Sequence, residues 1–240
     1  MSGYTINDFK NDCEKIDILL SEEQLSKFQR YYEILVEWNS FMNLTAITEY
    51  EDVLKKHFLD SLTIIQAVDF ASVNRMIDIG TGAGFPGIPL KIAFSNLKIV
   101  LLDSLGKRVK FLNHVIEELK LENIEAIHGR AEDFAREQQY RELFDLVVSR
   151  AVANLSSLSE YCIPYTILNG KFISYKSGKI EEEILSAQNA ISMLGGKVTD
   201  IYKFTLSDIG ERSLVVIDKV QKTPKKYPRK AGMPSREPLQ

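Results

Sequence analysis

The chain has 240 residues, of which 45% are apolar and 26% are charged, and its formal net charge is −3. This composition is typical of a soluble globular protein, and no apolar run approaches the roughly 18 residues that a membrane span needs. The two cysteines, Cys13 and Cys162, lie too far apart in sequence to suggest a disulfide framework, and the N-terminus lacks a signal pattern. We therefore expect a cytoplasmic protein without a membrane partner.

The first part of the chain, residues 1–73, is predicted to be an N-terminal helical subdomain. Residues 5–20 show helix-like apolar spacing, and residues 21–24 read Ser-Glu-Glu-Gln, a capping box that opens a second helix. A third helix is expected over roughly 51–68. Its residues His57 and Asp60 share one face, which we expect to pack against the rest of the protein.

From residue 74 to about residue 220, strand and helix patterns alternate. The predicted strands are 76–79, 97–102, 124–127, 144–148, 170–175, 197–204 and 213–220, and the predicted helices are 87–94, 107–119, 131–140, 155–161 and 181–194. No helix separates the last two strands, so we expect them to pair antiparallel. The alternation otherwise predicts an α/β fold with a doubly wound, mostly parallel, Rossmann-like sheet, and residues 74–220 are its domain.

A glycine-rich turn follows the first predicted strand, where residues 78–87 read Asp-Ile-Gly-Thr-Gly-Ala-Gly-Phe-Pro-Gly. Glycines can adopt positive φ and let a ligand approach bare backbone, and the following helix directs free N–H groups at the turn. A dinucleotide turn has the pattern G-x-G-x-x-G, but Phe85 stands at the third glycine. The carboxylate of Asp78 would also repel a pyrophosphate. S-adenosylmethionine, whose methionine end is net positive, fits this turn better.

Other polar residues stand where neighbouring strands end. Asp103 ends the second strand and is placed to hydrogen-bond both ribose hydroxyls, and Ala131-Glu132 follow the third strand, placed to meet the adenine. With Asp78, Gly80, Gly82 and Gly84 they form a predicted cofactor site. An NAD-dependent oxidoreductase, a small-molecule methyltransferase and a non-catalytic nucleotide-sensing protein remain alternatives on these residues alone.

Several motifs carry a resemblance to a known family. They are residues 78–90, 101–112, 129–133, 149–153 and 223–232, together with Trp38-Asn39, Asn43-Leu44-Thr45, His57 and Asp60-Ser61. Over nearly its whole length the chain resembles the small-subunit ribosomal RNA guanine-N7 methyltransferases, also called the glucose-inhibited division protein B family.

This resemblance implies a class I methyltransferase fold with S-adenosylmethionine as cofactor. It implies methylation at N7 of a guanine in the 530 loop of 16S rRNA, position 527 in rRNA numbering. It also implies cofactor contacts at Gly80, Phe85, Ala131, Glu132 and Arg150.

The chemistry of such a reaction needs alignment and a dry site rather than a general base, because guanine N7 carries a free lone pair at neutral pH. Arg150 is therefore expected to position a phosphate or the methionine carboxylate, bridging cofactor and substrate. Phe85 and Tyr175 are candidates to stack on the target base. Cys162 is expected to be a buried thiol rather than a nucleophile. The scattered histidines predict no metal site.

The candidate RNA contacts are basic residues near the predicted site and in the tail. Lys219 to Gln240 carry a net charge of +6 and residues 1–218 a net charge of −9, so the tail, residues 221–240, suggests a polyanion partner. The candidates are Lys107, Arg108, Lys176, Lys225, Lys226, Arg229 and Lys230. We expect the tail to order on binding 16S rRNA, with truncation after Val220 sparing cofactor binding. A lid over the active site is the alternative, and no obligate protein partner is evident.

Overall fold

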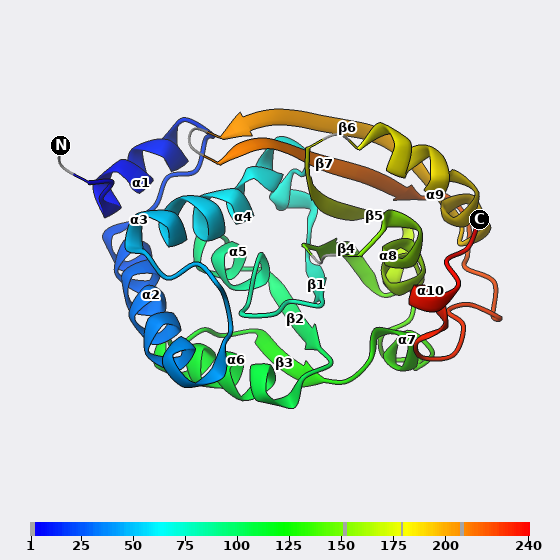
Figure 1. Ribbon diagram of the computed structural model, residues 1–240, viewed down its shortest axis with the longest axis horizontal. Helices are drawn as coiled ribbons and strands as arrows, with labels where there is room; N and C mark the ends of the chain where they lie inside the picture. The colour runs from blue at the N-terminus through cyan, green and yellow to red at the C-terminus, as the bar shows by residue number, and fades with distance from the viewer. Residues whose placement is uncertain (1–2, 151–152, 179, 207–208) are drawn as a thin grey trace.

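The computed structural model describes residues 3–150, 153–178, 180–206 and 209–240. Within these ranges seven strands form one sheet in the order β3-β2-β1-β4-β5-β7-β6 (Figure 1). The strands are β1 (Arg75–Ile79), β2 (Lys98–Asp103), β3 (Ile124–His128), β4 (Phe144–Ser149), β5 (Thr166–Ser177), β6 (Gly196–Leu206) and β7 (Gly210–Lys219). Residues 151 and 152 of the 149–153 motif lie outside the described ranges.

The strand directions confirm the predicted fold class. Strands β1 to β5 pair parallel with one another, whereas β7 pairs antiparallel with both β5 and β6. The chain winds outward from β1 through β2 to β3 and then returns to β4 on the other side of β1. Such a reversal opens a crevice at the carboxyl ends of the two central strands, which is where this class of fold binds ligands.

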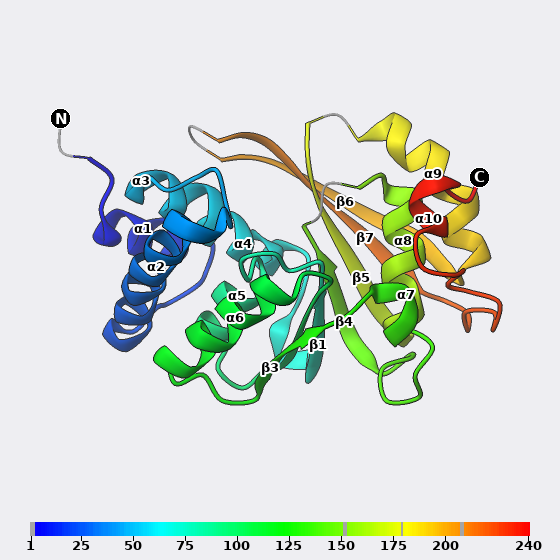
Figure 2. The same cartoon turned by 60° about the horizontal axis from the view of Figure 1, so that its bottom comes forward.

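Helices cover both faces of the sheet, with α1 to α6 on one side and α7 to α10 on the other (Figure 2). The α-helices are α1 (Ile6–Glu14), α2 (Glu22–Met42), α3 (Tyr50–Asp52), α4 (Asp60–Leu62), α5 (Gly87–Ala93), α6 (Gly106–Glu118), α7 (Ala131–Phe134), α8 (Leu155–Cys162), α9 (Glu181–Met193) and α10 (Met233–Arg236). The π-helix is η1 (Val53–Leu59), and the 3-10 helices are η2 (Thr63–Gln66), η3 (Phe70–Ser72) and η4 (Ile163–Tyr165). In the described part of the chain, no helix is both long and apolar enough to cross a membrane.

The N-terminal helices begin where the sequence predicts. Ser21 caps α2 through a capping box with Gln24, and Thr5 caps α1 in the same way through Asp8. Their apolar faces do not form a separate core, because residues such as Phe28 belong to one buried cluster that also contains sheet residues. The N-terminal elements are thus packed directly onto the sheet, which fixes their position beside the glycine-rich turn.

The predicted helix over 51–68 is present as a continuous helical segment over residues 50–66, but it is not α-helical throughout. The segment is divided into α3, η1, α4 and η2, with a π-helical turn in the middle. The backbone carbonyls of Lys56 and His57 receive hydrogen bonds from Arg150, and the His57 carbonyl also accepts one from Ser61. These bonds compete with the regular helical ladder. The predicted helix 131–140 is also shorter, since α7 ends at Phe134.

The tail was predicted to order only on binding RNA, and this prediction was wrong. Thr223 and Tyr227 are each 5% exposed, so the segment is packed against the body. The guanidinium of Arg141 donates to the carbonyls of Thr223, Pro224 and Tyr227. Side-chain donors of the body thus satisfy backbone acceptors that would otherwise need water. The basic composition of the tail suggested that it is solvated. Instead, the buried side chains of Thr223 and Tyr227 and the hydrogen bonds from Arg141 hold the tail against the body.

Candidate active site

The glycine-rich turn lies at the crevice between β1 and β4. Gly82 has φ of +63° and donates its backbone N–H to Asp103 Oδ2 at 2.9 Å. At Gly87, a Cβ would come within 2.3 Å of the Leu101 side chain, so only glycine allows α5 to pack this close to β2. The turn is therefore fixed by backbone conformation and close packing, as the sequence pattern predicted.

Asp78, at the end of β1, is fully buried beneath this turn. Its Oδ2 accepts hydrogen bonds from Thr81 Oγ1 at 2.7 Å and from the Gly87 N–H at 2.9 Å. Its Oδ1 has no hydrogen-bond partner among the described residues. Burial raises the pKa of the carboxyl to about 7, although the Thr81 and Gly87 hydrogen bonds act in the opposite direction. Asp78 is fully buried and is not among the residues that line the nearby cavities, so its predicted contact with the positive methionine end of S-adenosylmethionine stays a prediction.

Asp103, at the end of β2, is 2% exposed and holds the backbone around it. Its Oδ1 accepts the Leu105 N–H at 2.9 Å, and its Oδ2 accepts from Gly82 and, at 3.4 Å, from Arg108. The carboxylate thus connects the end of β2 to the glycine-rich turn. Any contact with ribose hydroxyls would use the remaining lone pairs of the same oxygens.

A cavity of about 270 Å³ opens at the ends of β1, β2 and β3. Its lining residues are Ile79, Gly80, Leu102, Ser104, Gly129, Arg130, Ala131, Glu132, Ala153, Leu158, Tyr161, Gly232 and Ser235. Three predicted cofactor residues, Gly80, Ala131 and Glu132, therefore meet at one cavity. Glu132 is 6% exposed, and its Oε1 accepts the backbone N–H of Gly232 in the tail at 2.7 Å.

A second and larger cavity, about 760 Å³, lies on the other side of Ala153, which lines both cavities. Its lining residues are Leu44, Lys56, His57, Asp60, Arg150, Ala153, Asn154, Tyr175, Lys176, Ser177, Glu183 and Arg212. Four of these side chains are basic and two are acidic. They come from the N-terminal helices, the end of β4, β5, α9 and β7, so this cavity exists only in the folded chain.

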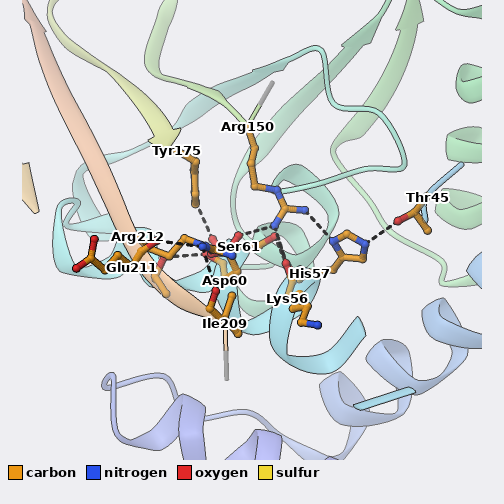
Figure 3. Close-up of polar contacts among 11 residues, drawn as sticks. Thr45, Lys56, His57, Asp60, Ser61, Arg150, Tyr175, Ile209, Glu211 and Arg212 are labelled. Atoms are coloured by element: carbon orange, nitrogen blue, oxygen red, sulfur yellow. Dashed lines mark hydrogen bonds and ion pairs between the residues drawn. The ribbon is translucent and has the colours of Figure 1, made fainter. Parts of the chain in front are cut away.

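An ion-pair network forms one wall of this larger cavity (Figure 3). Asp60, 4% exposed, accepts from Arg150 Nη1 at 2.7 Å on Oδ2 and from Arg212 Nε at 3.0 Å on Oδ1. One buried carboxylate therefore fixes two guanidinium groups from distant segments. Arg150 was predicted to bridge cofactor and substrate, and it lines the larger cavity, adjacent to the smaller one.

His57 lies between Arg150 and Phe85. Its Nδ1 is 3.3 Å from Arg150 Nη2, and its Nε2 is 3.0 Å from Thr45 Oγ1. Burial lowers the pKa of the imidazole to about 3, and the positive charge of Arg150 adds to this effect. The neutral ring stacks on Phe85 with a centroid distance of 4.4 Å. The expectation that His57 and Asp60 only pack against the sheet was therefore incomplete, because both line the larger cavity.

The two aromatic residues expected to stack on a base are buried. Phe85 is 6% exposed and is packed against His57, Tyr31 and Phe58. Tyr175 is also 6% exposed, and its hydroxyl donates to the Ser61 carbonyl at 2.7 Å. The contacts on the Phe85 ring leave it no place to stack on a base, whereas Tyr175 lines the larger cavity and its stacking role stays a prediction. Their rings fill the junction between the N-terminal helices and the sheet.

The candidate RNA contacts divide into engaged and exposed groups. Lys176 binds Glu183 at 2.7 Å and the Ala153 carbonyl at 2.6 Å, and Arg229 is paired with the fully buried Glu160. The exposed candidates are Lys107, Lys225, Lys226 and Lys230. Arg108 is intermediate and faces Asp103. Arg229 in particular cannot serve as a free tail cation without breaking a buried ion pair.

Sequence reasoning missed the residues that come from unrelated parts of the chain. Arg212, Tyr161 and Ser235 line the two cavities without belonging to any of the motifs, and Gly232 lies in the 223–232 motif but was not predicted to line a site. The only available signal was the Gly within the basic tail, which can adopt the positive φ of +82° seen at Gly232. Pairing of Arg212 with Asp60, 152 positions away, had no local signal at all.

Comparison with known proteins places this chain in a family. The family model for rRNA small subunit methyltransferase G matches residues 24–215. A protein named ribosomal RNA small subunit methyltransferase G from Lachnoclostridium phytofermentans is 55% identical over 92% of this chain and 91% of its own length. Proteins of the same name from Alkaliphilus metalliredigens and Desulforamulus reducens are 51% and 50% identical, covering 96% and 100% of this chain and 97% and 100% of their own lengths.

Solved structures agree on the fold. An O-methyltransferase from Bacillus cereus, solved in complex with SAH, superposes with a TM-score of 0.58 at 17% identity, covering 90% of this chain and 100% of that one. A protein described as an O-methyltransferase from Klebsiella pneumoniae superposes with a TM-score of 0.53 at 12% identity, covering 80% of this chain and 90% of that one. The chain therefore belongs to the ribosomal RNA small subunit methyltransferase G family, whose members use S-adenosylmethionine on a class I methyltransferase fold.

Proposed function

We propose that this protein methylates N7 of guanine 527 in the 530 loop of 16S rRNA, by in-line transfer from S-adenosylmethionine without a general base. Membership in a small-subunit rRNA methyltransferase family supports the RNA substrate. The choice of N7 and of this position follows from the sequence motifs of the family. It is supported by the chemistry of the larger cavity.

The observation that carries the proposal is that Asp60, His57 and Tyr175, which line the larger cavity, are already engaged. Asp60 accepts from two arginines, and His57 has contacts on both ring nitrogens. The low pKa of His57 makes its imidazole a weak base. The Tyr175 hydroxyl donates to a carbonyl. A nucleophile that must lose a proton would need a free base here, whereas guanine N7 attacks through an existing lone pair.

The two cavities suit the two reactants. We place the cofactor in the smaller cavity, between the glycine-rich turn and Glu132, and the target nucleotide in the larger one. The cofactor supplies an activated methyl group. The larger cavity holds Lys56, Arg150 and Arg212, which suit the phosphate groups of an extruded nucleotide. The cavities share Ala153, which would bring the reactants together there.

Arg150 is the positioning residue in this scheme. Its Asp60 partner and the carbonyls of Lys56 and His57 hold the guanidinium in one orientation. A guanidinium aimed at guanine N7 would block the reacting atom and oppose the positive charge that develops on the ring. We therefore assign Arg150 to a phosphate or to the methionine carboxylate.

The proposal is tested by methylating defined substrates with labelled S-adenosylmethionine. Naked 16S rRNA, assembled small subunits and whole ribosomes are incubated with purified protein, and the labelled base is mapped by mass spectrometry. We expect 7-methylguanosine at position 527 in at least one substrate. Label at another base, or at a different atom of that guanine, would overturn the substrate assignment while leaving the family membership intact.

A further inference from the structure

The C-terminal segment, residues 223–240, reaches the smaller cavity. It lies beside α7 and α8 in both views (Figures 1 and 2). Gly232 and Ser235 line that cavity together with Gly80 and Glu132. The Gly232 N–H donates to Glu132 Oε1 at 2.7 Å, so a predicted cofactor residue and the tail are directly bonded.

The segment is anchored on both sides of Gly232. Before it, Arg229 binds Glu160, which is fully buried, through its backbone N–H at 2.6 Å, its Nε at 3.0 Å and its Nη2 at 2.7 Å. After it, Ser157 Oγ donates to the carbonyl of Pro234 at 2.6 Å. Both anchors use side chains of α8. The turn at Gly232 is therefore held over the cavity from two points on one helix.

We propose that residues 231–240 are a structural wall of the cofactor site and that Gly232 positions the Glu132 carboxylate within it. This inference rests on the cofactor placement proposed above. A ligand pocket must enclose most of its ligand surface, and Gly232 and Ser235 of the tail, beside Leu158 and Tyr161 of α8, complete the lining that the ends of β1 and β2 and helix α7 begin. The bond from Gly232 also fixes the rotamer of Glu132, which reduces the ordering needed on binding.

The inference reverses an expectation drawn from the charge pattern. On charge alone, removing the tail should weaken RNA binding and leave cofactor binding unchanged. In the folded protein, the residues that carry the positive charge are not the residues that line the smaller cavity. Lys225 and Lys226 are exposed and do not line the smaller cavity, whereas Gly232 and Ser235 line it and carry no charge. The two roles can therefore be separated by substitution.

The first test is a variant that ends at Lys230. It removes Gly232 and Ser235 but keeps the packing of Tyr227 and the Arg229–Glu160 pair. We expect the dissociation constant of S-adenosylmethionine, measured by calorimetry, to rise about tenfold or more, as for a site that loses one hydrogen-bonded wall. The matched control replaces Lys225 and Lys226 with alanine in the full chain, and its cofactor affinity should stay within about twofold of the wild type.

A second variant keeps the chain at full length in case the shortened protein does not fold. Ser235 is exposed, so Ser235→Phe adds a ring at the cavity without disturbing the core. We expect Ser235→Phe to weaken cofactor binding about tenfold or more, and Lys197→Phe, at an exposed residue of β6 that does not line the cavity, to bind like the wild type. If Ser235→Phe binds S-adenosylmethionine with unchanged affinity, the proposal that the tail forms a wall of the cofactor site is wrong.

Asp103→Ala separates failure of the wall from failure of the cofactor placement. If Asp103→Ala weakens binding while the tail variants do not, the cofactor occupies the proposed site and the wall is wrong. If none of these variants changes the affinity, the placement itself is wrong, and the inference fails with it. Thermal unfolding without cofactor confirms that each variant is folded.

Discussion

The two cavities beside the glycine-rich turn are built in different ways. The smaller one lies at the ends of consecutive strands, where small residues such as Gly80, Gly129 and Ala131 leave backbone in its lining. The larger one is formed by long charged side chains, and its wall depends on Asp60 holding Arg150 and Arg212. The first is a product of chain geometry, and the second is a product of ion pairing between distant segments.

The two cavities should therefore respond differently when a single side chain is replaced. A cavity lined by backbone keeps its shape when most single side chains change, since main-chain hydrogen bonds such as that from the Gly80 N–H to the Leu102 carbonyl hold it. The wall of the larger cavity depends on one shared carboxylate, because Arg150 and Arg212 both lose their ion-pair partner when Asp60 is replaced. Each substitution below tests one side of this comparison.

The largest effect is expected at Asp60. Asp60→Ala leaves Arg150 and Arg212 without their carboxylate, and both guanidinium groups are mostly buried. Breaking a buried pair by removing one partner costs about 3–5 kcal/mol of unfolding free energy. Urea unfolding measures it, with Glu33→Ala as the control, because the exposed Glu33–Arg30 pair should contribute less than about 1 kcal/mol. Equal losses in the two variants would show that the network does not stabilise the larger cavity.

The next effect is a dependence of the unfolding free energy on pH that arises from Asp78. The unfolded chain releases this proton near the ordinary pKa of 3.8, and the folded chain only near 7, so Asp78 makes the protein less stable as pH rises between these values. His57 acts oppositely, because its pKa falls from 6.5 to about 3 on folding and its contribution is lost as pH falls.

Asp78→Asn removes the first of these contributions and leaves the second. We expect the stability of this variant, relative to wild type, to increase from pH 4.5 to pH 7.5. Urea unfolding at several pH values measures the difference. A difference that does not vary with pH would mean that Asp78 is ionised in the folded protein throughout this range.

A smaller effect is expected at Asp103, in the backbone cavity. Asp103→Ala removes the acceptor for the N–H groups of Gly82 and Leu105 and should weaken cofactor binding by roughly 1–3 kcal/mol. Calorimetric titration with S-adenosylmethionine measures the change. Asp69→Ala is a matched control, because Asp69 caps a 3-10 helix away from either cavity and accepts the Ala71 N–H. Full affinity in Asp103→Ala would place the cofactor elsewhere.

The smallest effect is expected at Lys107, an exposed cation in the first turn of α6. If Lys107 contacts a phosphate, Lys107→Ala reduces the slope of log affinity against log salt by about one. Filter binding to 16S rRNA at several salt concentrations measures the slope. Lys197→Ala, an exposed lysine on the edge strand β6, should leave it unchanged. An identical slope for both variants would remove Lys107 from the RNA surface.

Local pattern was enough to predict the fold class and the turn. The spacing of apolar residues changes between the strand period and the helix period along the chain, so it locates the elements. The glycine spacing, with Asp78 and Asp103 at strand ends, locates the turn. The same reasoning could not foresee that Phe85 lies under His57, or that the π-helical turn η1 interrupts the third helix. Both depend on contacts made by Arg150 and the aromatic cluster, which no local window contains.

The sequence by itself therefore determined the parallel sheet, the glycine-rich turn and the family, because these depend on backbone preferences encoded within short stretches. Only the tertiary structure decided how the basic tail packs and which residues form the wall of the larger cavity. The charge of Arg229 suggested a free cation for RNA, and Arg150 was predicted to position a phosphate or the methionine carboxylate. In the folded chain each guanidinium meets a buried carboxylate, Glu160 or Asp60, and a buried charge must be paired.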